Sequence, residues 1–71
     1  MSVLLQLGKK ISNLRRVKGY SQEELAHRAG MHRTYIGSVE RGEKNIAFRN
    51  LCKIADALEC TVSNLTDEID D

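Results

Sequence analysis

Residues 21–42 read SQEELAHRAGMHRTYIGSVERG, and this stretch decides the fold because it predicts two short helices with marked ends. Ser21 followed three residues later by Glu24 is the pattern of a capping box, in which each side chain bonds the other residue's backbone amide. Tyr20, just before the cap, is spaced to pack against the first leucine of the helix as a hydrophobic staple. The first helix is therefore expected over about residues 22–29.

A tight turn separates this helix from the next one. Gly30 begins a three-residue turn, since a glycine commonly follows the last residue of a helix, and the following helix is expected over about residues 33–41. Gly42 then ends that second helix. Two helices joined by three residues, the first of them a glycine, predict a helix-turn-helix over about residues 21–41.

Apolar residues recur every three or four positions in the rest of the chain, which is the period of amphipathic helices. With no proline present, three further helices are expected: one that ends at Gly19, one over about residues 47–59, and a short one capped by Thr61. Their apolar stripes are Leu4, Leu7, Ile11, Leu14 and Val17; Leu51, Ile54, Ala55 and Leu58; and Val62, Leu65 and Ile69. The predicted fold class is all-α, a compact five-helix bundle with residues 1–71 as a single domain.

Charge is divided unevenly along the chain, although the net charge is only +1. Residues 1–55 hold all eleven lysines and arginines and four glutamates, a net charge of +7, whereas residues 56–71 hold six acids and no base, a net charge of −6. A basic body with an acidic end is typical of a protein with one face against a polyanion. An unevenly charged solvated surface gives the same pattern, so charge alone does not assign the face.

Cysteine, metal and membrane features exclude several classes of protein. No secretory signal precedes Cys52 and Cys60, and no apolar run approaches the roughly 18 residues of a membrane span. We therefore expect a reduced, cytoplasmic protein with no membrane partner. Cys52 and Cys60 lie eight residues apart, so they and the pair His27 and His32 do not combine into one zinc motif, and no metal or other cofactor is expected. No catalytic residues are assigned, because there is no nucleophile–base pair and no glycine-rich phosphate loop.

The second helix of the predicted corner carries polar and small residues on the side that need not pack. Arg33, Thr34 and Ser38 are expected on this outer face, with Gly37 keeping its bulk low. Guanidinium and hydroxyl groups on a low-bulk helix suit a close approach to base edges in a DNA major groove roughly 12 Å wide. The pattern indicates a helix that reads DNA.

Taken together, these residues resemble the lambda-repressor/Cro type of helix-turn-helix regulator, also called the xenobiotic-response-element type. The resemblance covers about residues 7–66, and the Arg33–Ile36 run in so short a chain is most like the controller proteins of restriction–modification systems. The matching runs are Gln22-Glu23-Glu24-Leu25-Ala26, Ala29-Gly30, Arg33-Thr34-Tyr35-Ile36 and Val39-Glu40-Arg41-Gly42. The resemblance implies a sequence-specific transcriptional regulator of double-stranded DNA, on the nucleoid of a prokaryote or in phage biology. A phage-type repressor, or an antitoxin whose main partner is another protein, is the alternative.

The resemblance implies a base-reading set on the recognition helix. Arg33 would pair bidentately with guanine O6 and N7, unless it is merely a solvated arginine. Thr34 and Ser38 would touch base edges or thymine methyl groups. For Tyr35 two interpretations stay open: its hydroxyl reaches a base step or the DNA backbone, or its ring is simply half-buried.

Phosphate contacts are expected beside the base-reading set. Gln22 lies in the first turn of its helix, where the positive end of the helix dipole favours an anion, and in this family such a glutamine clamps a phosphate. The other phosphate candidates are His32, Arg41, Lys44, Asn45 and Arg49. His32 could instead cap its helix, and Arg49 could be a solvated charge. Phosphate contacts fix the register on DNA without reading its sequence.

Two charged residues are assigned to the scaffold instead. Arg15 and Glu40 match family positions that form an internal ion pair between the first and third helices. An exposed Glu40 at this place would repel DNA phosphate, which favours the structural assignment.

A homodimer is expected, because one helix reads only a few base pairs and a single half-site gives too little specificity. Members of this group bind half-sites about one helical turn, roughly 34 Å, apart as twofold dimers. Val62, Leu65 and Ile69, in a dimerisation segment of about residues 60–69, offer apolar surface for that contact. The alternative is that they only close the monomer core. RNA polymerase is a further candidate partner, and no small-molecule ligand is expected.

Overall fold

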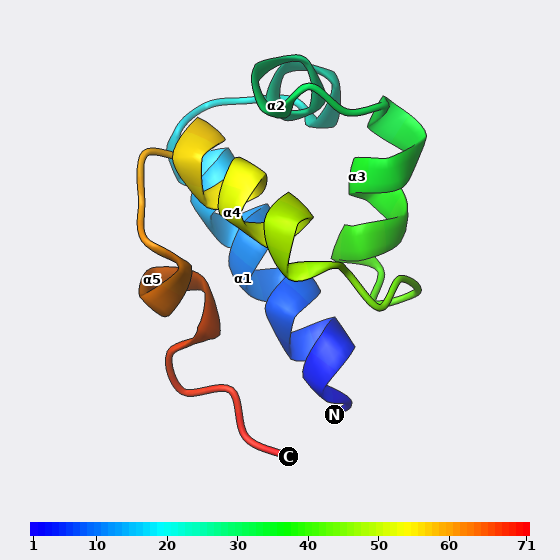
Figure 1. Cartoon of the computed structure of the whole chain (residues 1–71), viewed down its shortest axis with the longest axis vertical. Coiled ribbons are helices and arrows are strands. Elements are labelled where there is room, and N and C mark those ends of the chain that lie inside the picture. Colours follow the sequence, from blue (N-terminus) through cyan, green and yellow to red (C-terminus); the bar gives the residue numbers. More distant parts are fainter.

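Five helices and no strand make up the chain in the computed structural model, which describes all residues from Met1 to Asp71. They are α1 (Val3–Val17), α2 (Gln22–Ala29), α3 (Arg33–Glu40), α4 (Phe48–Ala57) and α5 (Val62–Thr66). In Figure 1, α4 lies across α1, α2 covers one end of the bundle, and α3 and α5 stand on opposite sides. The predicted all-α, five-helix fold is confirmed.

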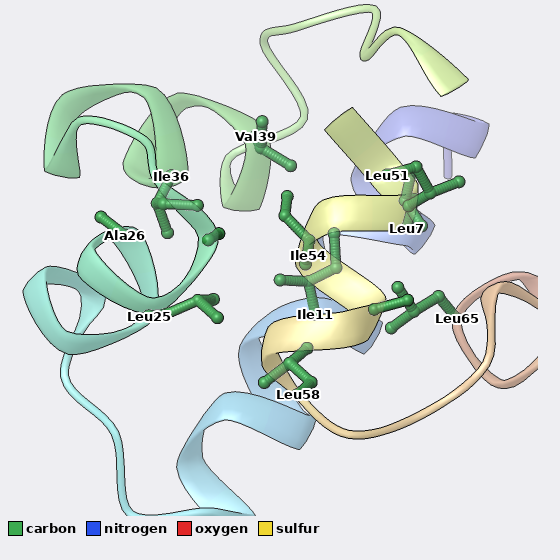
Figure 2. Packing of buried hydrophobic residues seen from close by; sticks show 12 residues of the cluster. Leu7, Ile11, Leu25, Ala26, Ile36, Val39, Leu51, Ile54, Leu58 and Leu65 are labelled. Carbon is green, nitrogen blue, oxygen red and sulfur yellow. The ribbon is translucent and has the colours of Figure 1, made fainter. Parts of the chain in front are cut away.

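The core lies where the five helices meet. Twelve apolar side chains are buried in it. Ile11, Leu25, Ile36, Ile54 and Leu65, one from each helix, are fully enclosed (Figure 2). Full burial of such a side chain contributes about 1.5–3 kcal/mol, so every helix is anchored to the same core. Because α3 packs against both α2 and α1, its orientation is fixed from two sides.

The ends of α2 lie where the sequence predicts, because local bonds set them. The Ser21 hydroxyl oxygen accepts a hydrogen bond from the Glu24 amide at 3.0 Å, and a left-handed glycine at position 30 ends the helix. The reciprocal half of the predicted capping box is wrong, since the Glu24 carboxylate accepts from Arg28 Nε at 2.8 Å instead. The reciprocal box occurs at α5, between Thr61 and Asn64.

The apolar stripe of α1 is shorter than predicted, and a glycine takes part in its packing. Val17 is 83% exposed, because no other helix covers that side of the last turn. Gly8, to which the sequence analysis gave no role, is buried against the C-terminal end of α3. A Cβ atom at Gly8 would lie 2.4 Å from the Glu40 carbonyl oxygen and 2.6 Å from that of Val39. The backbones of α1 and α3 therefore meet directly.

The two chain ends are tied together through α1. Gln6 Nε2 donates to the Asp70 carbonyl oxygen at 2.7 Å, and Gln6 Oε1 accepts from the Asp70 amide at 3.0 Å. Both ends consequently lie at one end of the molecule (Figure 1). None of the five helices has the length and apolar character needed to cross a membrane.

Candidate nucleic-acid interface

The first turn of α3 faces solvent. Arg33 and Thr34 are exposed there, immediately after the three-residue turn that follows α2. His32 occupies the N-cap position of α3 and is exposed, but its side chain makes no capping hydrogen bond. The donors of all three side chains are therefore available to a ligand that approaches the beginning of α3.

The middle of α3 is less open than the sequence analysis expected. Ser38 is only 8% exposed, and its hydroxyl donates to the Tyr35 carbonyl oxygen at 2.7 Å. An outer-face position for Ser38 is wrong, because a serine in a helix can bond its own preceding turn and lie flat against it. Gly37 is also buried: the Arg41 guanidinium lies across it, with Nη1 3.1 Å from where a Cβ would stand. Gly37 thus leaves room for an arginine rather than an open surface.

Tyr35 is tied to α4. Its ring is half-buried, and its hydroxyl oxygen accepts a hydrogen bond from Asn50 Nδ2 at 3.1 Å. The phenolic hydrogen stays available as a donor. Tyr35, Ser38 and Thr34 line a shallow hollow beside α3, together with His32, Arg41 and Lys44.

A buried polar cluster joins α1, α2 and α3. Glu40 Oε2 accepts from Arg15 Nε at 2.7 Å, and Glu40 Oε1 accepts from Arg15 Nη2 at 3.1 Å and from Gln22 Nε2 at 3.0 Å. The side chains of Arg15 and Glu40 are 10% and 6% exposed. Arg15 Nη1 also donates to the Tyr20 carbonyl oxygen at 2.8 Å. The cluster neutralises Glu40 and holds the Gln22 amide group at the beginning of α2.

Arg41 is the cation at the other end of α3. It lines a hollow with Gln22, Arg33, Thr34 and Gly37, and it also borders the hollow that contains Tyr35. Its guanidinium is already paired, since Nε and Nη2 donate to the Glu43 carboxylate at 3.0 and 3.2 Å. Further exposed polar side chains follow α3, in the loop and in the first turn of α4: Lys44, Asn45 and Arg49.

A basic groove that was not predicted from the sequence lies between α1, the beginning of α2 and the end of α3. Gln22 and Arg41 meet Lys9 and Arg16 there, and the remaining lining residues are Leu5, Ser12, Asn13 and Glu40. Lys9 and Arg16 are exposed, whereas Glu40 is neutralised by its bonds to Arg15. A signal was present, because Lys9, Ser12, Asn13 and Arg16 are spaced by three or four residues along one side of α1.

The proposed dimerisation residues divide into two kinds. Leu65 is fully buried in the monomer core, so the prediction that its side chain contacts a second copy is wrong. α5 ends at Thr66 and points this leucine toward α1 and α4, with which α5 packs. Val62 and Ile69 remain partly exposed, Ile69 beyond the end of the helix. Of the three proposed residues, only Val62 and Ile69 expose side-chain surface to a partner.

The chain is similar to known proteins over most of its length. A family model described as helix-turn-helix matches residues 11–65. Control protein C.SmaI of Serratia marcescens is 44% identical over 59 residues, which cover 83% of this chain and 70% of that protein. Control protein C.BamHI of Bacillus amyloliquefaciens is 39% identical over 67 residues, 93% of this chain and 83% of that protein.

Solved structures give the same result. The restriction–modification controller protein C.AhdI from Aeromonas hydrophila superimposes with a TM-score of 0.86 at 42% identity, covering 87% of this chain and 94% of that one. SinR, a master regulator for biofilm formation that was solved in complex with DNA, superimposes with a TM-score of 0.81 at 37% identity. That match covers 86% of this chain and 98% of the other. The resemblance found in the sequence to helix-turn-helix regulators, and to controller proteins among them, is confirmed.

Proposed function

Since the chain belongs to the helix-turn-helix family of DNA-binding transcriptional regulators, we propose that it binds a twofold symmetric operator as a homodimer, with α3 in the major groove. One observation carries the proposal: Arg33 and Thr34 are exposed on the first turn of α3, while cationic hollows flank that helix. An α-helix with its side chains is about 10–12 Å across and fits a groove of about 12 Å.

The reading of bases is assigned to the first turn of α3. No carboxylate pairs with Arg33 in the structure. Either edge of its guanidinium can therefore donate two hydrogen bonds, one to guanine O6 and one to N7. Thr34 beside it offers a hydroxyl and a methyl group. Tyr35 is a weaker candidate, because only its phenolic hydrogen is free, and Ser38 is withdrawn as a base reader because its hydroxyl is used within α3.

Phosphates are assigned to the two sides of α3. On one side the Gln22 amide, held by Glu40, stands at the positive end of the α2 dipole, with Arg16 and Lys9 along the same groove. On the other side His32 and Lys44 line the hollow beside α3, and Asn45 and Arg49 are exposed farther along the chain. Cations on both sides of a helix match the two phosphate strands that border a major groove.

The genes we propose as targets are those of a restriction–modification operon. Similarity to two control proteins and to a restriction–modification controller protein supports this assignment over an antitoxin or a phage-type repressor. DNA binding would place the chain on the nucleoid in the cytoplasm. Selection of bound duplexes from a random pool tests the whole proposal, since it is expected to return one twofold symmetric site. Failure to enrich any site would contradict it.

Arg33→Ala is expected to weaken binding to the selected site by about 1–3 kcal/mol, roughly 5-fold to 160-fold, and to relax the preference at one base pair. The reason is that the variant loses two hydrogen bonds to a single guanine. Titration of site variants with purified protein measures both effects, and thermal melting is expected to stay unchanged because Arg33 is exposed.

Lys53→Ala is the matched control for this substitution. It removes the same charge from an exposed position of α4 that no proposed contact uses. If Lys53→Ala weakened operator binding as much as Arg33→Ala, the loss would reflect net charge and Arg33 would not be a base reader.

Val62→Glu is expected to shift the protein from dimer to monomer, since it places a charge on the partly exposed apolar side of α5. Sedimentation of the free protein at micromolar concentration measures the shift, and operator binding should become weaker and depend more steeply on protein concentration. Val17→Glu makes the same substitution at the end of α1, where the valine is 83% exposed and lies outside residues 60–69, and this variant is expected to stay dimeric. A wild-type protein that sediments as a monomer would refute the dimer.

A further inference from the structure

Arg41 carries its own counter-ion at the candidate interface. Its Nε and Nη2 atoms both donate to the Glu43 carboxylate, at 3.0 and 3.2 Å, and the two side chains are about 60% and 57% exposed. The Arg41 guanidinium keeps the pKa of Glu43 below its usual value, so this residue is a carboxylate at neutral pH. The pair as a whole has no net charge.

The position of Arg41 makes this pairing consequential. The guanidinium lies across Gly37 and close to Gln22, and it borders the hollows on both sides of α3. If α3 enters the major groove, as proposed above, a DNA phosphate approaches this end of the helix. Arg41, the residue immediately after α3, is then a cation at that end of the helix.

We propose that Glu43 competes with DNA for Arg41 and thereby lowers the affinity of the chain for DNA. A guanidinium offers a fork of two parallel N–H donors, and carboxylate and phosphate bind it in the same bidentate manner. Glu43 occupies one such fork. A phosphate must displace that carboxylate or share the guanidinium with it. If both anions bind the same guanidinium, they repel each other.

This competition lowers the affinity for every DNA sequence alike. Phosphate contacts carry no sequence information, so a competitor for a phosphate contact lowers the affinity for operator and for other DNA by the same factor. The preference for the operator therefore stays as Arg33 sets it. What changes is the protein concentration at which the operator fills, the quantity that matters for a regulator with no assigned effector.

A second ion pair in the chain supplies the matched control. Lys18 Nζ and Glu59 Oε1 are 2.9 Å apart, and Glu59 is exposed. This pair joins the residue after α1 to the second residue after α4 and borders no hollow of α3. Glu59→Gln removes the same charge as Glu43→Gln without touching the candidate interface.

The test is a titration of a short mixed-sequence duplex with the full chain at several salt concentrations. Glu43→Gln is expected to bind about two- to fivefold more tightly than the wild type, the range that an exposed ion pair spans. The dependence of affinity on salt should also steepen, by up to about one phosphate contact. Glu59→Gln is expected to match the wild type, and thermal melting of all three proteins should agree within a few degrees.

The Arg41→Gln background identifies the mechanism. Arg41→Gln alone should weaken binding, and adding Glu43→Gln to it should restore little, because the competitor no longer has a cation to occupy. A gain of equal size in both backgrounds would overturn the inference, since Glu43 would then act by general repulsion. Unchanged or weaker binding of Glu43→Gln would overturn it as well. A wild-type chain that bound no duplex at low salt would refute the proposed function itself, a result distinct from these.

Discussion

Glu40→Ala is expected to lower the free energy of unfolding by about 3–5 kcal/mol, because it leaves the Arg15 guanidinium buried without its carboxylate. Arg15 and Glu40 share two hydrogen bonds, and both side chains are at most a tenth exposed. A domain of this length has a total stability of roughly 4–11 kcal/mol, so the variant would lose a large share of it. Denaturant unfolding followed by circular dichroism measures the loss.

Glu24→Ala is the control for this prediction. It removes the ion pair between Glu24 and Arg28, which lie one helical turn apart and whose side chains are both close to half-exposed. Exposed pairs of this kind contribute only about 0.3–0.5 kcal/mol. If Glu40→Ala melted like the wild type, the buried cluster would not stabilise the fold. Glu40→Ala should also free the Gln22 amide, so DNA binding by whatever fraction stays folded should weaken.

The helix boundaries were accessible from the sequence because local bonds determine them. Ser21 caps α2 through a contact three residues away, and a glycine ends it in a conformation that other residues adopt reluctantly. The same holds for Thr61 at α5. Such contacts join residues at most four positions apart, so no knowledge of the tertiary structure is needed to find them.

The direction of individual side chains was less accessible. Successive residues of an α-helix are turned by about 100°, so a stripe predicts a face but not which edge residue is covered. Ser38 was expected outside and is covered, while Val17 was expected inside and is exposed. Leu65 was expected at a partner and fills the core, because α5 lies flat on α1 and α4.

The candidate site was predictable only where a local sequence signal marks its residues. Arg33 and Thr34 follow a turn that the sequence marks, so their exposure could be foreseen. The basic groove required the position of α1 against the corner, which no local pattern gives. The bidentate pair of Arg41 and Glu43 spans a helix end, where the chain direction after Gly42 decides whether the two side chains meet.

Gly8→Ala is expected to destabilise the domain by about 3 kcal/mol or more, although alanine is the better helix former. The new methyl group would stand 2.4 Å from the Glu40 carbonyl oxygen and 2.6 Å from that of Val39. Both are backbone atoms at the end of α3 that cannot rotate away, so α1 would have to move off α3. The gain in helix propensity, about 1 kcal/mol, is too small to offset this.

Gly37→Ala is the matched substitution, and the opposite sign is expected. The nearest atom to its new methyl group is Arg41 Nη1 at 3.1 Å, the free end of a flexible side chain that can swing aside. Unfolding free energy should rise by about 0.5–1 kcal/mol, while duplex affinity should fall because Arg41 is displaced from its place over α3. Denaturant unfolding and duplex titration of both variants separate the two effects. A Gly8→Ala protein as stable as Gly37→Ala would mean that α1 and α3 do not meet through their backbones, so that packing on α2 would remain as the main contact that orients α3.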